Sequence, residues 1–229
     1  MTRDWACGGV DNACTTRTIH ASNHSLMPRM KIHLSAVALV LSVALAGSGM
    51  AAKRGKYVLE SMGASSVSFP AEGTLEVAFS PNEGSQDLVI KVIDASSREL
   101  RVLAYSFTSA PVVEALLRAK ARGVDIKVVV DRRNNEVEDH SGKARAALSA
   151  LVNAGVDVRT IDVYPIHHDK VIVSDRRTVE LGSFNFSDAA ARRNSENVLV
   201  NWGNPRLAEA YLDHFRRNYV QSVPYSLQY

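Results

Sequence analysis

The feature that most constrains the fold is a regular alternation of strand-like and helix-like segments, which begins at Thr74. The strand-like segment Asp125–Asp131 has an apolar interior apart from Lys127, and this is typical of a strand buried on both faces of a sheet. Amphipathic segments such as Ser85–Ala95 have apolar residues three and four positions apart, which predicts helices between the strands. The alternation predicts an α/β domain with a mixed sheet sandwiched between helices on both faces.

The element boundaries follow from turn residues and helix caps. The expected strands are 74–79, 100–107, 125–131, 156–161, 166–174, 178–184 and 197–200, and the expected helices are 85–95, 109–122, 141–153, 187–192 and a last helix that starts at Asn204 and Pro205. The strands 166–174 and 178–184 are separated by only a short connection, so we expect them to form a hairpin.

The N-terminal region has the organisation of an export signal. Arg29 and Lys31 precede the apolar run Leu34–Ala46, which is too short to span a bilayer comfortably but suits the apolar part of a signal peptide. Small residues follow, so we expect cleavage near Ser48 or Ala52 and a periplasmic or secreted product. An uncleaved membrane anchor or a buried helix is the alternative interpretation.

The chain then divides into four parts. Residues 1–26 hold both cysteines and show no periodicity, so we interpret them as an upstream mis-start. The signal peptide is 27–52, a weakly patterned linker is 53–73, and the folded domain is 74–229. The mature chain would have no cysteine, which excludes a disulfide framework and thiolate metal ligands.

The charge of the chain does not indicate its partner. The formal net charge is +3 and most of it lies in residues 1–52, so the remainder is close to neutral. Global charge therefore argues neither for nor against a nucleic acid.

The predicted hairpin gathers four polar side chains, which are His168, Lys170, Ser183 and Asn185. Residues two apart on a strand project from the same face. If the turn is centred between residues 176 and 177, His168 faces Asn185 and Lys170 faces Ser183, so that all four converge on one side of the sheet.

These residue types suit the chemistry of a phosphate diester. Lys170 can hold a phosphate oxygen, Ser183 and Asn185 can donate hydrogen bonds, and Gly182 lets another backbone approach closely. His168 can act as a nucleophile or as an acid or base near neutral pH. Carboxylates are scarce among these residues, so we expect no metal and no cofactor, and phosphoryl transfer without a metal fits the cluster best.

The spacing of these residues resembles a known signature. His168-Asp169-Lys170, then Asp175, then Gly182-Ser183-Phe184-Asn185 matches the HxK(x4)D(x6)GSxN pattern of the phospholipase D superfamily. The segment 194–197 and the strand 125–131 further resemble the small secreted, EDTA-resistant bacterial endonucleases of that superfamily. The resemblance covers the chain from about Leu75 to its C-terminus.

The resemblance implies a mechanism. His168 would attack phosphorus and form a covalent phosphohistidine, a second motif histidine would protonate the leaving oxygen, and water would release the product. This chain carries one motif, and its neighbouring His167 lacks the matching lysine. Two chains would therefore each contribute one His168 to a shared active site, which makes the expected assembly a homodimer.

The resemblance also assigns roles around the histidine. Lys170, Ser183 and Asn185 would bind the phosphate, and Glu196 would orient the imidazole through its other ring nitrogen. We expect Asp175, at the end of the hairpin, to make a turn contact or ion pair rather than touch substrate.

Several arginine pairs could contact substrate. Arg132 with Arg133 and Arg176 with Arg177 lie in loops bounding the predicted strands, where they could line a groove for a nucleic-acid backbone. The alternative is an ordinary solvated surface. No aromatic and basic stripe suggests base readout, so we expect no sequence specificity.

Three functions compete. The leading hypothesis is a sequence-nonspecific endonuclease, and the main alternative is a phospholipase D that hydrolyses phosphatidyl lipids. Lipid hydrolysis would favour an exposed apolar loop near the site, and the sequence shows no long amphipathic or aromatic loop of this kind. A nucleic-acid-binding protein without catalysis is the third possibility, and the intact motif argues against it.

Overall fold

The computed structural model describes residues 66–68 and 70–227. The predicted mis-start, the predicted signal peptide and most of the predicted linker lie outside the described residues. Within the described part of the chain, no helix is both long enough and apolar enough to cross a membrane.

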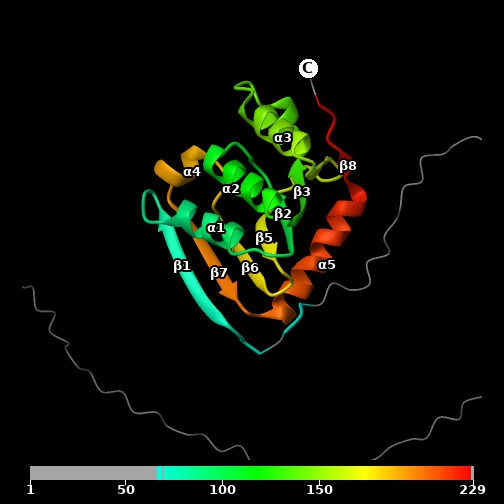
Figure 1. Cartoon of the computed structure of the whole chain (residues 1–229). Helices are drawn as coiled ribbons and strands as arrows, with labels where there is room; N and C mark the ends of the chain where they lie inside the picture. The colour runs from blue at the N-terminus through cyan, green and yellow to red at the C-terminus, as the bar shows by residue number, and fades with distance from the viewer. Residues whose placement is uncertain (1–65, 69, 228–229) are drawn as a thin grey trace, which may run out of the picture. The chain divides into compact units, whose positions relative to one another are not determined.

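The described chain forms one eight-stranded sheet with helices on both faces (Figure 1). The strands are β1 Thr74–Ser80, β2 Glu99–Ala104, β3 Asp125–Asp131, β4 Asp157–Ile161, β5 Lys170–Ser174, β6 Thr178–Gly182, β7 Glu196–Trp202 and β8 Val223–Pro224. The helices are α1 Ser85–Asp94, α2 Ala110–Ala121, the π-helix Arg133–Val137, α3 Lys143–Asn153, α4 Asp188–Arg192 and α5 Pro205–Gln221. Across the sheet the strands run in the order β1-β7-β6-β5-β2-β3-β4-β8.

The pairing of the strands makes the sheet mixed. β2, β3 and β4 are parallel to one another, whereas β5 runs antiparallel to β2, and β6, β7 and β1 continue the antiparallel half. The crossovers between the parallel strands contain α2 and the π-helix with α3. This confirms the predicted α/β fold with a mixed sheet.

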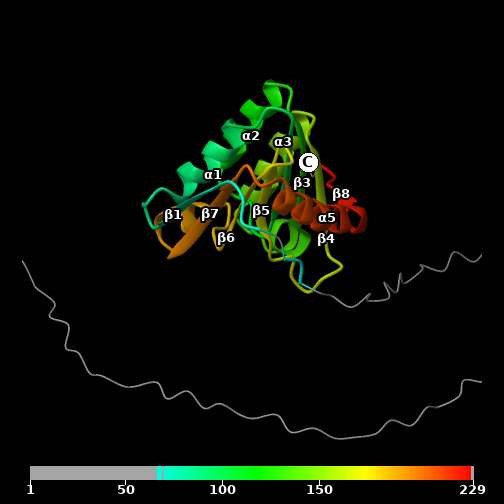
Figure 2. The same ribbon diagram turned by 90° about the horizontal axis from the view of Figure 1, so that it is seen from below.

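Two apolar cores lie on the two faces of the sheet. The first packs α1, α2 and α3 against one face and includes Leu116 and Ile126, and the second packs α5 against the other and includes Val129 and Phe215. Figures 1 and 2 show the strands between these two helical layers. Burial of these side chains is the main source of stability, at roughly 25 cal/mol per Å² of apolar surface.

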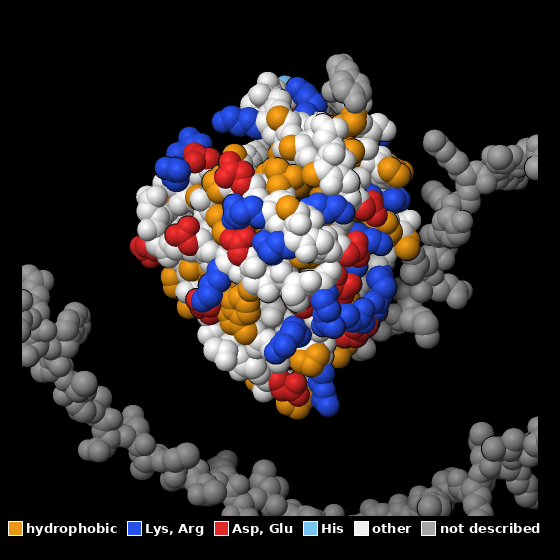
Figure 3. Space-filling model, in the orientation of Figure 1, with side chains coloured by type: hydrophobic (Ala, Val, Ile, Leu, Met, Phe, Trp, Pro, Cys, Tyr) orange, Lys and Arg blue, Asp and Glu red, His pale blue; other side chains and the backbone are white. Residues whose placement is uncertain are grey.

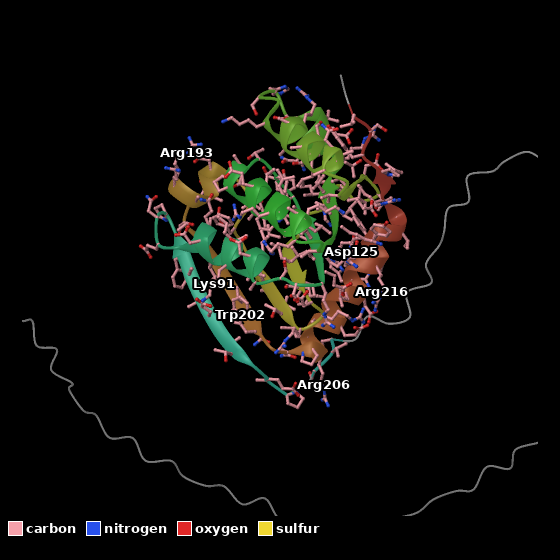
Figure 4. The ribbon with its side chains drawn as sticks, in the orientation of Figure 1. Lys91, Asp125, Arg193, Trp202, Arg206 and Arg216 are labelled. Carbon is pink, nitrogen blue, oxygen red and sulfur yellow. The ribbon has the colours of Figure 1, made fainter. Side chains whose placement is uncertain are left out.

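A polar cluster fastens α1 to the antiparallel edge of the sheet. Lys91 of α1 forms an ion pair with Glu76 of β1 at 2.8 Å, and the indole of Trp202 donates a hydrogen bond to Glu76 at 2.9 Å. Figure 4 shows Lys91 and Trp202 side by side, and the ammonium lies 5.6 Å from the centre of the indole ring. The cluster is exposed, so it fixes orientation more than it adds stability.

The hairpin forms as predicted, but its predicted register is wrong by one residue. Ser174 pairs with Thr178 and Val171 with Leu181, so the turn is centred on Arg176 and the loop has three residues. In this register Lys170 lies opposite Gly182 rather than Ser183. Asp175 and Arg176 both adopt positive φ values, 52° and 59°, which allows the chain to reverse direction here. The predicted centre of the turn was between residues 176 and 177.

Tertiary contacts shorten two predicted strands. β2 ends at Ala104 because the side chain of Asn135 takes over the next backbone groups, accepting from the amide of Phe107 and donating to the carbonyl of Tyr105. β5 begins only at Lys170, since the amide of His167 donates to a carboxylate of Asp131 instead of to a strand. Neither side chain could be assigned to these backbone groups from the sequence.

Candidate active site

Most of the predicted site residues, including His168, Lys170, Ser183, Asn185 and Glu196, meet at one end of the sheet. Four strands end here, namely β1, β2, β3 and β6, and two strands begin here, namely β5 and β7. In Figure 1 this is the end that carries α4. Irregular segments follow or precede each of these strands, so that functional side chains stand on loops held by a rigid sheet.

His168 and Lys170 are neighbours in this site. His168 is exposed, and its ring lies 4.8 Å from the ring of Tyr105. Lys170 is buried; its ammonium donates a hydrogen bond to the carbonyl of His168 at 2.9 Å and lies 5.1 Å from the Tyr105 ring centre. Burial lowers the pKa of Lys170, and the carboxylates of Asp169 and Glu196 act in the opposite direction.

Tyr105 was not predicted as a site residue, yet it contacts both members of this pair. It comes directly after β2, a parallel strand whose carboxyl end faces the site, which is where functional side chains of α/β proteins gather. The predicted strand ran to residue 107, so Tyr105 was expected inside the strand rather than at its end.

Ser183 and Glu196 form a second pair beside the first. The Ser183 hydroxyl donates to the Glu196 carboxylate at 2.6 Å and accepts from the amide of Asn197 at 3.1 Å. The side chain of Asn194 donates to the other carboxylate oxygen at 3.0 Å. Within the described part of the chain His168 forms no hydrogen bond with Glu196, so the structure places Glu196 in the cluster without showing it orienting the imidazole.

Asn185 and Gly182 complete the cluster. The side-chain oxygen of Asn185 is buried and has no hydrogen-bond partner among the described residues. Gly182 lies against β7, and a Cβ at this position would meet the carbonyl oxygen of Asn197 at 2.2 Å. Only glycine permits this approach of the two strands, so the motif glycine sets how closely Ser183 can lie to Glu196.

Asp175 lies at the opposite end of the hairpin. Its carboxylate accepts hydrogen bonds from the amides of Ser97, Arg98 and Glu99 at 2.8–3.0 Å. Burial alone would raise the pKa of Asp175, but these bonds outweigh it and hold the pKa below its usual value. The residue thus ties the hairpin turn to the start of β2 and stands far from His168.

The structure separates the two arginine pairs that the sequence analysis grouped. Arg132 and Arg133 follow β3 at the same end as His168, where they form ion pairs with Asp162 at 2.8 Å and Glu138 at 2.6 Å.

Arg176 and Arg177 lie in the β5–β6 turn at the other end of the sheet, and Arg176 pairs with Glu209 at 2.8 Å. A groove lined by both pairs beside His168 is therefore not formed within one chain. Figure 3 shows basic and acidic side chains interspersed over the face covered by α1–α3, without a large patch of one sign.

A short apolar loop precedes the motif. Val163, Tyr164 and Ile166 follow β4 and are 52%, 39% and 53% exposed. It is not the long amphipathic or aromatic loop whose absence was noted in the sequence, but it places apolar side chains beside the site. The loop leads directly into His167 and His168.

No group of three or more His, Cys, Asp or Glu side chains is arranged to hold a metal ion within the described residues. The described site thus consists of an imidazole, an ammonium, a hydroxyl, an amide and one carboxylate. This set can hold a phosphate group and attack its phosphorus.

Comparison with known proteins identifies the family. The model of the family described as "Cardiolipin synthase, PLD-like domain" matches residues 89–219. The chain is a member of the phospholipase D superfamily. Its enzyme class is accordingly that of the superfamily, a hydrolase of phosphodiesters.

Relatives within the superfamily carry two kinds of name. A phospholipase D of Rickettsia conorii is 34% identical over 141 residues, which cover 62% of this chain and 67% of the relative. The solved structure of Nuc, a phospholipase D family member from Salmonella typhimurium, is 42% identical with a TM-score of 0.64 and covers 67% of this chain and 99% of Nuc. NucT from Helicobacter pylori, at 18% identity and a TM-score of 0.57, shares the fold; the match covers 66% of this chain and 100% of NucT.

Proposed function

We propose that this superfamily member is a metal-independent, sequence-nonspecific endonuclease that acts through a covalent phosphohistidine. The observation that carries the proposal is the juxtaposition of exposed His168 with buried Lys170 and with the partly buried Ser183 and Asn185 at one end of the sheet. The similarity to Nuc over nearly the whole of that protein favours nucleic acid as the substrate.

In the proposed mechanism His168 attacks phosphorus and forms an N–P bond, while the P–O bond to the leaving group breaks. Lys170 and the buried amide of Asn185 hold the non-bridging oxygens, where negative charge grows in the transition state. Water then attacks the phosphohistidine, which releases the phosphate product and restores the imidazole. Hydrolysis thus passes through two displacements at phosphorus.

We further propose that two copies of the chain share one active site. The leaving oxygen needs a proton at the moment that His168 acts as the nucleophile, so a second acid is required. The described chain holds one copy of the motif, and His168 stands exposed at the end of the sheet, where a second copy can reach it. A two-fold axis near His168 would supply the same histidine from the partner as the acid.

Hydrolysis of phosphatidyl lipids is the second candidate function. It is favoured by the exposed side chains of Val163, Tyr164 and Ile166 next to the motif, which could contact acyl chains, and by relatives named phospholipase D. The catalytic cluster serves both substrates equally well, because both are phosphodiesters.

Plasmid cleavage in excess EDTA tests the proposal. The wild-type protein, His168→Ala and His140→Ala would be compared, His140 being an exposed histidine outside the motif. We expect EDTA-resistant nicking that is lost in His168→Ala and kept in His140→Ala. Cleavage that survives in His168→Ala would refute the phosphohistidine mechanism.

A parallel assay separates the two substrates. The same three proteins would be given vesicles of phosphatidylcholine or cardiolipin, and headgroup release would be measured. Release from lipid without cleavage of DNA would move the assignment to a phospholipase D, whereas DNA cleavage without lipid hydrolysis supports the endonuclease.

We also propose that residues 27–52 direct export and are removed, because a basic start, an apolar run and small residues follow one another there. N-terminal sequencing of the protein recovered from the periplasm or medium tests this. A mature N-terminus between residues 48 and 53 is expected, and an intact leader would contradict cleavage.

A further inference from the structure

A polar cluster lies behind the catalytic strand, on the face of the sheet that α5 covers. Asp169 stands between His168 and Lys170 in the chain, so its side chain points to the opposite face. There His214 of α5 meets it, with Nε2 2.9 Å from a carboxylate oxygen of Asp169. The ring of His167 lies on the same oxygen, with its Nε2 at 3.2 Å.

The surroundings of His214 fix which ring nitrogen carries its proton. The guanidinium of Arg217 lies 2.7 Å from Nδ1 of His214, and a guanidinium can only donate. Nδ1 is therefore the acceptor, and the neutral ring carries its proton on Nε2, from which it donates to Asp169. Asn218 adds a hydrogen bond to the backbone carbonyl of His214 at 2.9 Å. Asp169, which precedes β5, is thus linked through His214 to Arg217 and Asn218 of α5.

His167 is buried and is held through its backbone. The residue is 3% exposed and its ring nitrogens have no well-formed hydrogen bond among the described residues, whereas its amide donates to the carboxylate of Asp131 at the end of β3 at 2.8 Å. The segment that carries His168 is therefore fixed on one side by β3 and on the other by α5. Polar groups this well buried and connected hold a backbone in one position.

The cluster also acts on the charge of the site. Burial alone would raise the pKa of Asp169, but the contacts of His167 and His214 with its carboxylate outweigh it and hold the pKa far below its usual value. Asp169 in turn supports the charge of Lys170, whose pKa burial lowers. Burial and the same carboxylate raise the pKa of nearby Tyr211, so its phenol stays neutral and adds no second anion to the cluster.

We propose that Asp169, held by His214 of α5 with His167 beside it, is a positioning residue that fixes the His168–Lys170 segment. The inference rests on the catalytic roles proposed above for His168 and Lys170. It extends the active site to the C-terminal helix, which touches no substrate. The arrangement parallels the carboxylate and histidine partners that orient catalytic groups from behind in other enzymes.

Hydrolysis of bis(p-nitrophenyl) phosphate as a function of pH tests the inference, because this small diester reports on chemistry without a polymer. Asp169→Asn keeps the size of the side chain but removes its charge. We expect kcat to fall by about tenfold or more, KM to stay within about twofold, and the basic limb of the kcat profile to move to lower pH by roughly half a unit or more. A purely structural role would lower activity without moving that limb.

Two variants of the helix residue provide the matched comparison. His214→Ala removes the donor to Asp169 and should lower kcat, whereas His214→Gln places an amide donor near the position of Nε2 and should recover most of the loss. His140 is an exposed histidine that forms no hydrogen bond with Asp169 or His214 in the described part of the chain, so His140→Ala should behave as the wild type. If circular dichroism shows that Asp169→Asn does not fold, the comparison of His214→Ala with His214→Gln tests the positioning role by itself.

The outcomes separate this inference from the proposed function. Full activity of His168→Ala would overturn the proposed function itself. Loss of activity in His168→Ala together with wild-type kinetics in Asp169→Asn or His214→Ala would overturn only the positioning role. Equal losses in His214→Ala and His214→Gln, without a shift of the basic limb in Asp169→Asn, would also overturn it.

Discussion

Two carboxylates on the β5–β6 hairpin show how strongly the surroundings of a single residue decide its charge. Asp175 accepts three backbone hydrogen bonds and is held ionised, as described above. Glu180, five residues further on, is fully buried between Ile172 and Val200, and its carboxylate oxygens have no well-formed hydrogen bond among the described residues. Burial raises the pKa of Glu180 from 4.5 to about 8, and the nearby backbone of Ile172 offsets only part of the effect.

Glu180 should therefore make the protein less stable as the pH rises. Between pH 4.5 and about 8 the folded protein keeps a proton that the unfolded chain releases, so the free energy of unfolding falls through this window. The total loss is on the order of 3–5 kcal/mol at about 1.4 kcal/mol per pH unit. Glu180→Gln stays neutral at every pH and should flatten this dependence.

Urea unfolding of both proteins at pH 5 and pH 8 measures the effect through the midpoint and slope of each transition. The variant should gain stability relative to the wild type as the pH is raised. An identical pH dependence of the two proteins would show that Glu180 is ionised in the fold or bonded to a group that the described residues do not reveal.

At the scale of elements, the β5–β6 turn carries a residue that its backbone does not favour. The amide of Arg177 donates to the carbonyl of Ser174 at 3.1 Å, and both central residues have positive φ, so the turn is of type I′. Type I′ turns prefer Asp-Gly or Asn-Gly, whereas here Arg176 follows Asp175. A left-handed conformation costs a non-glycine residue about 1–2 kcal/mol.

Arg176→Gly should therefore raise the free energy of unfolding by about 1 kcal/mol. The exposed ion pair of Arg176 with Glu209 offsets part of the gain, since such pairs contribute about 0–1 kcal/mol. Arg177→Gly is the matched control, because Arg177 has no positive φ and a glycine there only adds freedom to the unfolded chain. Thermal unfolding of the two variants beside the wild type gives the comparison, and a destabilised Arg176→Gly would show that the ion pair outweighs the strain.

The same turn shows how far the sequence could predict the site. The hairpin, its motif residues and the bounds of β3 followed from periodicity and turn residues alone. The register of the hairpin could not be predicted, because Asp-Arg is not a typical sequence of a type I′ turn. The three-residue loop changes which side chains of the two strands face one another. β2 ends at Ala104 and β5 begins at Lys170 because the side chains of Asn135 and Asp131, which are distant in sequence, accept hydrogen bonds from the neighbouring backbone amides.

Contacts between distant elements account for the remaining differences. Tyr105 reaches the motif because β2 and β5 are neighbours in the sheet, and His214 reaches Asp169 because α5 crosses behind β5. Neither neighbour relation is encoded in local periodicity. Residues of the motif were recognised by their spacing, whereas residues that position them were visible only in the fold.

At the scale of the whole molecule, the proposed phosphohistidine mechanism requires a second acid in addition to His168. His168 is exposed at the end of the sheet, and the histidine beside it, His167, is buried and engaged with Asp169 and Asp131. His214 is turned toward Asp169 on the other face. The described chain therefore holds the proposed nucleophile, and neither His167 nor His214 stands free beside it to act as the acid.

Mixing wild-type and His168→Ala subunits tests whether two chains share the site. If each active dimer needs both copies of His168, exchange with an equal amount of variant should lower the activity of a fixed amount of wild type to about half, and a tenfold excess should lower it to about a tenth. The variant would capture wild-type subunits in inactive pairs. Activity is followed by plasmid nicking in EDTA after the mixture has equilibrated.

The control is His140→Ala, which keeps the motif and should form fully active mixed dimers at any ratio. If the excess of His168→Ala leaves wild-type activity unchanged while capture of an affinity-tagged variant shows that subunits have exchanged, a single chain completes the reaction and the acid must come from within it. If sedimentation shows monomers at concentrations where the enzyme is fully active, the shared site is refuted directly. A site built from two chains is supported only if activity falls in proportion to the fraction of dimers in which both subunits are wild type.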